Sequence, residues 1–320
     1  MQAAVYYETG EPSVFRHEEV LNPVCRGRGV LVDVAAVSIE GGDVLHRAGG
    51  EMTGSPHIVG YQCAGTIREI GPDVTDREVG QRVTLTVPSG SHAEIVTVAA
   101  HGVWPVPDSL SIEEAACIPI PFGTADDCLF EFGRLQPGET VLVQGGGGGV
   151  GLAAIQLAKR HGATVYATAS SDSKLERLSA YGMDAGINYV EKDLVPEVMR
   201  LTDGKGIDLV VDPVGGEVLQ SSLGCAGYRG RVITVGNMSR GERQVSIEGL
   251  LQGNQSLTGV FLGAELGTPR VYEMIAGHIH DVAAGELKVV IDREFALSEA
   301  ADAHAYIESR QAFGRVLLRP

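Results

Sequence analysis

Hydrophobic positions in the first 120 residues fall in short runs that turn residues separate. Each run is rich in valine, isoleucine or threonine, which is typical of strands in a sheet. Gly71, Gly80 and Gly90 lie between the runs and mark turns. The pattern predicts a β-rich unit with strands at residues 30–37, 64–70, 82–87 and 93–98.

From about residue 121, apolar runs alternate with segments of helical periodicity. Helices are predicted at residues 152–162 and 173–182. Strands are predicted at residues 141–144, 164–168, 207–212, 231–236 and 256–262. This alternation is typical of βαβ units and predicts a parallel, doubly wound sheet.

The remaining segment combines both patterns. Helices are predicted at residues 271–284 and 297–310, and strands at 288–291 and 314–318. We expect this segment to return to the first unit. The expected fold is therefore α/β with two domains, one discontinuous over residues 1–120 and 268–320 and the other over 121–267.

A run of five glycines, residues 145–149, separates the strand predicted at 141–144 from the helix after it. Gly146, Gly148 and Gly151 fit the pattern G-x-G-x-x-G, in which missing Cβ atoms let the backbone approach a pyrophosphate at a helix N-terminus. Strand and helix lie where this mechanism needs them. We predict dinucleotide binding by Gly146, Gly148, Gly149, Val150 and Gly151.

The end of the second predicted strand distinguishes the two nicotinamide cofactors. An NAD site carries an acidic residue about 20 positions after the glycine turn, where this chain has Ala169. Ser170, Ser171 and Lys174 offer two hydroxyls and an ammonium to a 2′-phosphate. The alternative is that the serines cap the next helix and that Lys174 is solvated. We predict NADPH as the cofactor.

Net charge, hydrophobicity and cysteine content disfavour several classes of protein. The 320 residues carry a formal net charge of −16, which disfavours a nucleic-acid partner because phosphate contacts need a basic face. No apolar stretch approaches the roughly 20 residues of a membrane span, and the first residues do not resemble a signal peptide. Five scattered cysteines without a C-x-x-C pair are typical of free thiols in a reducing compartment. We expect a cytoplasmic protein with no membrane partner.

Several motifs in a fixed order resemble one known family across nearly the whole chain. They are residues 60–67 (GYQCAGTI), 79–83 (VGQRV), 107–116 (PDSLSIEEAA), 137–143 (PGETVLV), 148–159 (GGVGLAAIQLAK) and 208–216 (DLVVDPVGG). The chain is similar to the medium-chain dehydrogenase/reductase superfamily, in its zinc-free quinone oxidoreductase (zeta-crystallin-like) branch. The resemblance implies a GroES-like β-rich catalytic domain, a doubly wound Rossmann domain, a small-molecule substrate between them, and a homodimer.

The same resemblance implies roles for further residues. Positions that match Lys174 and Tyr189 bind the 2′-phosphate in zinc-free relatives, although a half-buried strand-end aromatic is the alternative for Tyr189. Asp212 is expected to end a strand and accept backbone hydrogen bonds. Positions that line the nicotinamide pocket match Thr124, Val214, Gly215 and Gly236.

Zinc-dependent relatives carry a catalytic cysteine three residues before an aspartate, and a later Gly-His-Glu. The matching positions here are Glu40, before Asp43, and Gly60-Tyr61-Gln62. Because the cysteine and the histidine are both replaced, tetrahedral zinc has no ligand set, and we predict no metal.

Glu40 and Tyr61 are the candidate catalytic residues, since the resemblance places both near the nicotinamide. A Glu40 carboxyl that burial keeps protonated is a candidate proton donor, and an ionised one can accept a hydrogen bond from a substrate hydroxyl or amine. The alternative is a turn carboxylate that faces solvent or pairs with Arg47. Tyr61 is a second candidate proton donor or a wall of the cleft, and Asp43 is interpreted as a helix N-cap.

The predicted activity is that of an NADPH-dependent oxidoreductase, which transfers hydride to a quinone or an α,β-unsaturated carbonyl without zinc. One alternative is an enoyl or keto reductase of a biosynthetic pathway, with a specialised substrate that Glu40 selects. The other is a protein that binds NADPH without turnover. The strand predicted at residues 256–262 is a candidate dimer edge or an internal strand.

Overall fold

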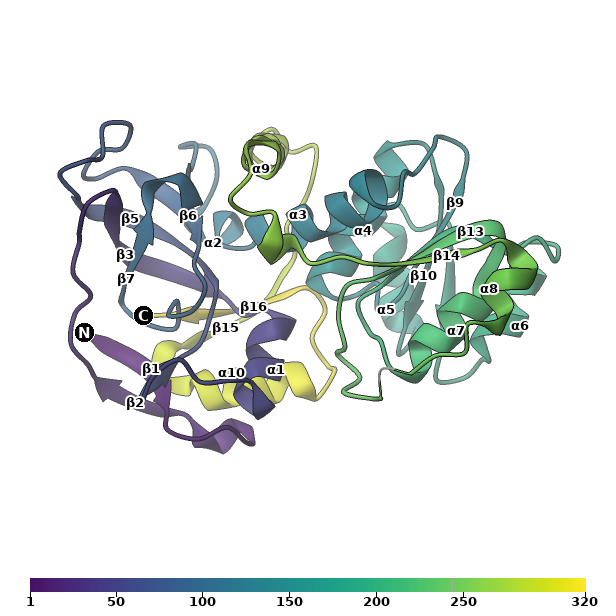
Figure 1. Ribbon diagram of the computed structural model, residues 1–320, viewed down its shortest axis with the longest axis horizontal. Coiled ribbons are helices and arrows are strands. Elements are labelled where there is room, and N and C mark those ends of the chain that lie inside the picture. Colours follow the sequence, from purple (N-terminus) through teal and green to yellow (C-terminus); the bar gives the residue numbers. More distant parts are fainter. Residues whose placement is uncertain (243) are drawn as a thin grey trace. The chain divides into compact units, whose positions relative to one another are not determined.

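A computed structural model describes residues 1–242 and 244–320 of the protein (Figure 1). The chain divides into two compact units. Met1–Ile120 and Glu265–Pro320 form the first, and Pro121–Ala264 forms the second. The α/β fold class predicted from the sequence is confirmed, since one unit is dominated by antiparallel strands and the other by a parallel sheet with helices.

The main sheet of the first unit contains strands from both ends of the chain. Its order is β15-β16-β3-β5-β6-β8, and β7 also pairs with β3. β16 pairs antiparallel with β3, so the yellow C-terminal strands in Figure 1 complete a sheet that earlier strands began. These strands are β3 (Gly29–Ser38), β5 (Gln62–Ile70), β6 (Arg82–Thr86), β7 (Ile95–Ala99), β8 (Val103–Pro105), β15 (Ile291–Ala296) and β16 (Arg315–Arg319).

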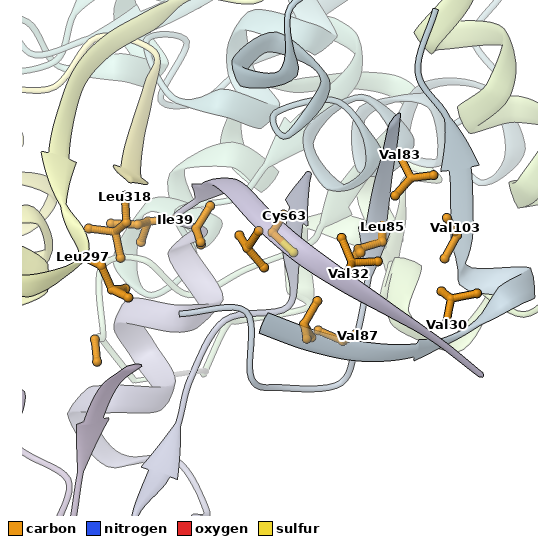
Figure 2. Packing of buried hydrophobic residues seen from close by; sticks show 14 of the residues in the cluster. Val30, Val32, Ile39, Cys63, Val83, Leu85, Val87, Val103, Leu297 and Leu318 are labelled. Carbon is orange, nitrogen blue, oxygen red and sulfur yellow. The ribbon is translucent and has the colours of Figure 1, made fainter. Parts of the chain in front are cut away.

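A second, small sheet has the order β2-β1-β4, built from β1 (Gln2–Tyr6), β2 (Arg16–Glu19) and β4 (His57–Ile58). The helices of this unit are α1 (Gly41–Gly49), α2 (Ile112–Ala115), α9 (Pro269–Ala283) and α10 (Ala300–Glu308). The core is aliphatic and includes residues from the C-terminal segment. Figure 2 shows Val30, Val32, Ile39, Cys63, Val83, Leu85, Val87, Val103, Leu297 and Leu318 within it.

The second unit contains a six-stranded parallel sheet of order β11-β10-β9-β12-β13-β14. Its strands are β9 (Thr140–Val143), β10 (Thr164–Ala169), β11 (Ala185–Asn188), β12 (Ile207–Asp212), β13 (Ala226–Thr234) and β14 (Ser256–Gly259). Its helices are α4 (Gly149–Arg160), α5 (Asp172–Ser179), α6 (Leu194–Leu201), α7 (Glu217–Cys225) and α8 (Glu248–Gly253). Helix α3 (Pro119–Asp126) lies at the boundary and continues into a π-helical turn, Asp127–Glu131.

One predicted strand is wrong in its position. Residues 288–290 are outside any strand, and β15 instead covers Ile291–Ala296, which pairs with β16 from Ile291↔Arg315 to Ala296↔Arg319. Pairing with β16 determines this strand, although its own residues are charged and half exposed. Within the described residues, no helix is both long and apolar enough to cross a bilayer.

Candidate functional site

The first candidate region lies at the carboxyl ends of the central parallel strands. β9 is the first strand of its sheet, β10 lies on one side of it and β12 on the other. This reversal of strand order is the switch point at which open α/β sheets bind ligands. Gly145 follows β9 and Val214 follows β12, and a Cβ atom added to Gly145 would lie 3.4 Å from Val214 Cγ2.

The glycines of the turn after β9 have different physical roles. A Cβ atom on Gly146 would lie 2.8 Å from Leu178 Cδ1, and one on Gly151 would lie 2.5 Å from the Gly145 carbonyl oxygen. Both glycines therefore permit close packing of the turn against the unit. Gly148 is exposed, and its Cβ atom would meet nothing closer than 3.5 Å. The fold itself has room for a side chain at Gly148.

The backbone N–H groups of the turn divide into two sets. Gly145 N–H donates to Thr168 Oγ1 at 2.9 Å, Gly146 N–H donates to the Thr168 carbonyl at 2.8 Å, and Gly148 N–H donates to the Gly145 carbonyl at 3.0 Å. The N–H groups in the first turn of a helix have no acceptor within that helix. In α4 these are the groups of Gly149, Val150 and Gly151, and they suit the pyrophosphate of a dinucleotide.

The predicted 2′-phosphate residues gather at the adjoining ends of β10 and β11. Ser171 is the N-cap of α5, because its Oγ accepts from Lys174 N–H at 3.3 Å. Ser171 therefore caps the helix as an acceptor, a role in which its hydroxyl can still donate, and Ser170 precedes it. Tyr189 is 43% exposed and its N–H donates to the Ala169 carbonyl at 3.2 Å.

Sequence reasoning missed Asn188 at this edge. Its side-chain amide donates to Asp172 Oδ1 at 3.0 Å, at the start of α5. This bond holds an acidic side chain beside the serines. The apolar pattern did not predict strand β11, so Asn188 was only a polar residue outside any predicted element.

The loops after β12 and β13 form the other side of the switch point. Asp212 Oδ1 accepts from the N–H groups of Val214 and Gly215 at 2.8 and 2.9 Å, as expected for this residue. Gly215 has a φ of 69°, and its Cβ atom would lie 2.7 Å from the Gly236 carbonyl oxygen. Val214, Gly215 and Gly236 are therefore close together. Thr124 lies separately on α3, where it is buried.

The second candidate region belongs to the first unit and centres on Glu40, which is 4% exposed. Arg315 on β16 forms a buried ion pair with Glu40 Oε1. The Gln62 amide donates to the same oxygen at 2.5 Å, and Gln62 Oε1 accepts from Ile120 N–H at 2.8 Å. The proposed alternative of a solvent-facing or Arg47-paired carboxylate is wrong, because Arg47 pairs with Glu308.

Arg315 has further acceptors besides Glu40. Its Nε and Nη2 atoms donate to Ser38 Oγ at 3.0 and 2.7 Å, and Nη2 also donates to the Ile39 carbonyl at 2.6 Å. Burial raises the pKa of Glu40 to about 7, while Arg315 and Gln62 lower it. No local sequence signal reveals this pair, since its partners are 275 positions apart.

Asp43 is not the helix N-cap that the sequence suggested. Glu40 is the N-cap of α1, and Asp43 lies three residues later, where its Oδ2 accepts from Glu40 N–H at 2.9 Å. This is one half of a capping box, in which the acid inside the helix satisfies the cap residue's own N–H. Asp43 Oδ1 is buried with no hydrogen-bond partner among the described residues, and burial raises the Asp43 pKa well above its ordinary value.

Tyr61 lies directly against the start of α1. A Cβ atom on Gly42 would overlap the Tyr61 hydroxyl, which explains a glycine at that position. Burial raises the pKa of Tyr61 well above its ordinary value, and the carboxyl groups of Asp43 and Glu40 add to this effect. Tyr61 is thus a protonated phenol at neutral pH beside the buried Glu40–Arg315 pair.

This region does not fit a zinc ion. A metal at the Glu40 position would need the carboxylate that Arg315 and Gln62 already bind, and the guanidinium would repel a second cation. Across the described residues, no cluster of three or more His, Cys, Asp or Glu side chains has a geometry that could hold a metal.

Comparison with known proteins gives matches across the chain. Residues 27–108 match the family described as alcohol dehydrogenase GroES-like domain, and residues 149–277 match the one described as zinc-binding dehydrogenase. A quinone oxidoreductase of Pseudomonas aeruginosa is 31% identical, over 100% of this chain and 99% of its own. The synaptic vesicle membrane protein VAT-1 homolog of Danio rerio is 33% identical over 92% of this chain.

Some relatives are longer. The chain spans 65% of the Danio rerio protein and 15% of a phenolphthiocerol/phthiocerol polyketide synthase of Mycobacterium tuberculosis, to which it is 32% identical. Among solved structures, Escherichia coli quinone oxidoreductase complexed with NADPH has a TM-score of 0.96 at 27% identity, covering 100% of both chains. A 2-haloacrylate reductase has a TM-score of 0.85 at 31% identity, covering 100% of this chain and 99% of its own.

Proposed function

The chain belongs to the medium-chain dehydrogenase/reductase family, among its quinone oxidoreductase-like members, and on this premise we propose that it is a zinc-independent, NADPH-dependent reductase. Its acceptor is a quinone or an α,β-unsaturated carbonyl. The observation that carries the proposal is the glycine turn at the switch point, with three N–H groups of α4 available to a pyrophosphate. The E. coli neighbour with NADPH supports the cofactor.

When bound, NADPH supplies a hydride to the acceptor, which then needs one proton. The N–H groups of Gly149, Val150 and Gly151 would hold the pyrophosphate, and Ser170, Ser171, Lys174 and Tyr189 would hold the 2′-phosphate. Val214, Gly215, Gly236 and Thr124 position the nicotinamide. These contacts orient the reacting atoms, which is the protein's main contribution in this chemistry.

We assign the proton donor to Tyr61. Above its pKa of about 7 the Glu40 carboxylate balances the buried charge of Arg315, and protonation would leave that charge uncompensated. Glu40 therefore serves as a fixed acceptor beside Tyr61. With an enone as acceptor, the Tyr61 phenol would give its proton to the α-carbon, and water would then reprotonate the tyrosinate.

The variant Tyr61→Phe tests this assignment. We expect kcat for an enone to fall by about 100-fold, since general acid catalysis contributes about 10²–10⁴. The NADPH dissociation constant is expected to stay within about twofold. Tyr228→Phe, which removes an exposed hydroxyl in the second unit, is the matched control. Unchanged enone turnover in Tyr61→Phe would exclude Tyr61 as the donor.

The reductase itself is tested by the loss of NADPH absorbance with a simple quinone, a linear enone, a 2-haloacrylate and an enoyl thioester, with NADH in parallel. We expect turnover of at least one acceptor and a preference for NADPH. Tight NADPH binding without turnover of any acceptor would contradict the reductase and favour a binding protein.

A second candidate is a reductase of a biosynthetic pathway. The similarity to a segment of a polyketide synthase supports it. Turnover restricted to the enoyl thioester would establish this candidate, whereas turnover of the quinone would favour the general reductase.

We further propose a cytoplasmic homodimer that pairs through β14. This strand is the open edge of the six-stranded sheet, and Phe261 beside it is 76% exposed. The five cysteines are free thiols, which suits a reducing compartment. Light scattering of the purified protein distinguishes dimer from monomer.

A further inference from the structure

A chain of side-chain hydrogen bonds runs through the interior of the second unit. Its members come from the ends of three adjacent strands and from one helix. Gln144 follows β9, Thr168 lies in β10, Asp212 ends β12, and Ser222 lies on α7. All four side chains are buried.

The four links all point in one direction. Gly145 N–H donates to Thr168 Oγ1 at 2.9 Å, and the Thr168 hydroxyl donates to Gln144 Oε1 at 2.9 Å. The Gln144 amide donates to Ser222 Oγ at 3.0 Å, and the Ser222 hydroxyl donates to Asp212 Oδ2 at 2.9 Å. A hydroxyl has one proton to give, so the order of donors is fixed and ends on the carboxylate.

The other carboxylate oxygen extends the chain to a second loop. Asp212 Oδ1 accepts from Val214 N–H and Gly215 N–H. That loop turns through two glycines with φ of 69° and 57°, Gly215 and Gly216. An unbroken series of hydrogen bonds thus joins the glycine turn after β9 to the loop after β12.

Because the four side chains are buried, the strength of each hydrogen bond depends on its neighbours in the chain. A buried donor or acceptor without a partner loses its bonds to water without replacement. Bonds in such a chain also polarise one another in a low-dielectric interior. Breaking a link within the chain therefore changes the constraint at both ends, in addition to the direct packing of Val214 beside Gly145.

We infer that Thr168, Gln144 and Ser222 are positioning residues that couple the pyrophosphate turn to the Val214–Gly215 loop. Order at one loop is transmitted to the other through the hydrogen-bond chain. The part that concerns NADPH rests on the proposed function, whereas the coupling between the two loops is a property of the protein alone.

The test compares Thr168→Val, Ser222→Ala and the double variant. We expect each single variant to bind NADPH about tenfold more weakly, and the double variant also about tenfold, because one break already uncouples the loops. Ser222→Ala is expected to bind 2′,5′-ADP, which lacks the nicotinamide half, within about twofold of the wild type. A multiplicative loss of about 100-fold in the double variant, or equal weakening of both ligands, would overturn the inference.

Hydrogen exchange of the ligand-free protein separates this inference from the proposed function. We expect Ser222→Ala to increase exchange at the amide of Gly145, which Ser222 does not contact. Unchanged exchange at Gly145 would refute the coupling even if NADPH binds, and faster exchange would support it even if NADPH does not.

Two controls address nonspecific destabilisation. Ser221→Ala makes the same substitution one residue away, where the hydroxyl donates to the Glu217 carbonyl within its own helix, and should leave both readouts unchanged. Thr168→Ser keeps the donating hydroxyl and should restore most of the affinity that Thr168→Val loses. An equal loss in Thr168→Ser would assign the effect to packing and contradict the inference.

Discussion

At Gly148 the fold itself does not require a glycine, so the residue type is explained by the pyrophosphate that we propose for this turn. The backbone has a φ of −84°, which any residue adopts, and the position of a Cβ atom is open. Gly151 differs, since its Cβ atom would overlap the Gly145 carbonyl. The sequence motif includes both glycines without distinguishing them.

We predict that Gly148→Ala keeps the thermal stability of the wild type but weakens NADPH binding by about tenfold or more, because the methyl group occupies the path of the phosphate. Gly151→Ala should instead reduce the free energy of unfolding by about 1–3 kcal/mol, through overpacking. Thermal melts and NADPH titrations of the two variants test this. Equal stability loss in both would show that Gly148 also has a packing role.

Part of the environment of Glu40 follows from its local sequence, and part depends on distant residues. Its three-residue spacing to Asp43 is that of a capping box, of which the structure shows the half in which Asp43 accepts from Glu40 N–H. The ion pair with Arg315 was not predictable, because it needs the tertiary pairing of β16 with β3.

Removing only one partner of this pair should destabilise the first unit. We predict that Glu40→Gln lowers the free energy of unfolding by about 3–5 kcal/mol, since the Arg315 charge stays buried and unpaired. The double variant Glu40→Gln/Arg315→Met should recover at least half of that loss. Urea unfolding measures both. A loss below about 1 kcal/mol in Glu40→Gln would mean that Arg315 reaches solvent.

At the scale of elements, the local hydrophobic pattern correctly predicted those strands whose own residues are buried. β9, β10 and β12 begin and end within one or two residues of the predicted ranges, because their continuous apolar runs reflect burial on both faces. Helices α6 and α7 were not predicted, and β15 was misplaced. Helix α6 is amphipathic, but it spans only eight residues and contains Pro196, so its pattern is short. Helix α7 and the charged, half-exposed β15 carry little periodic signal, and pairing with β16 decides the position of β15.

The helix α10 contributes a pH-sensitive contact. His304 Nε2 on α10 lies 3.2 Å from His92 Nε2, and both rings are buried. Burial lowers the pKa of His92 to about 3 and that of His304 well below its ordinary value, and Arg47 lies near His304. The unfolded chain takes up these protons near pH 6.5, whereas the native protein does not.

We predict that the free energy of unfolding falls as the pH drops below about 6.5, by up to about 1.4 kcal/mol per pH unit for each histidine. His304→Gln keeps a hydrogen-bonding group but cannot titrate. Between pH 6.5 and 5.0 the free energy of unfolding of His304→Gln should therefore fall by about 1–2 kcal/mol less than that of the wild type. Urea unfolding at the two pH values measures the difference. Parallel losses in both proteins would assign the acid sensitivity to other groups.

For the whole molecule, the family and the α/β fold class follow from ordered motifs and are confirmed by the comparisons. The glycine turn lies where the local pattern placed it, whereas the surroundings of Glu40 and Asn188 depend on tertiary contacts that no local pattern contains. The first unit is built from both ends of the chain and the second is continuous, and shortening the chain tests this division.

We predict that deleting residues 297–320 unfolds the first unit but not the second. The deletion removes Leu297 and Leu318 from the aliphatic core and leaves Glu40 without Arg315. Hydrogen exchange should show lost protection in β3 and β5, with β9 and β12 still protected. Full protection of β3 in the shortened chain would contradict a dependence on the C-terminal segment.

The insertion of the second unit into the first also orders events during synthesis on the ribosome. All strands from β9 to β14 have emerged before β16 is made, so the nucleotide-binding sheet can form on the growing chain. The edge of β3 that pairs with β16 stays unpaired until β16 has been synthesised. Until then it is an open template for other strands, and chaperone protection of the nascent chain matters most in that interval.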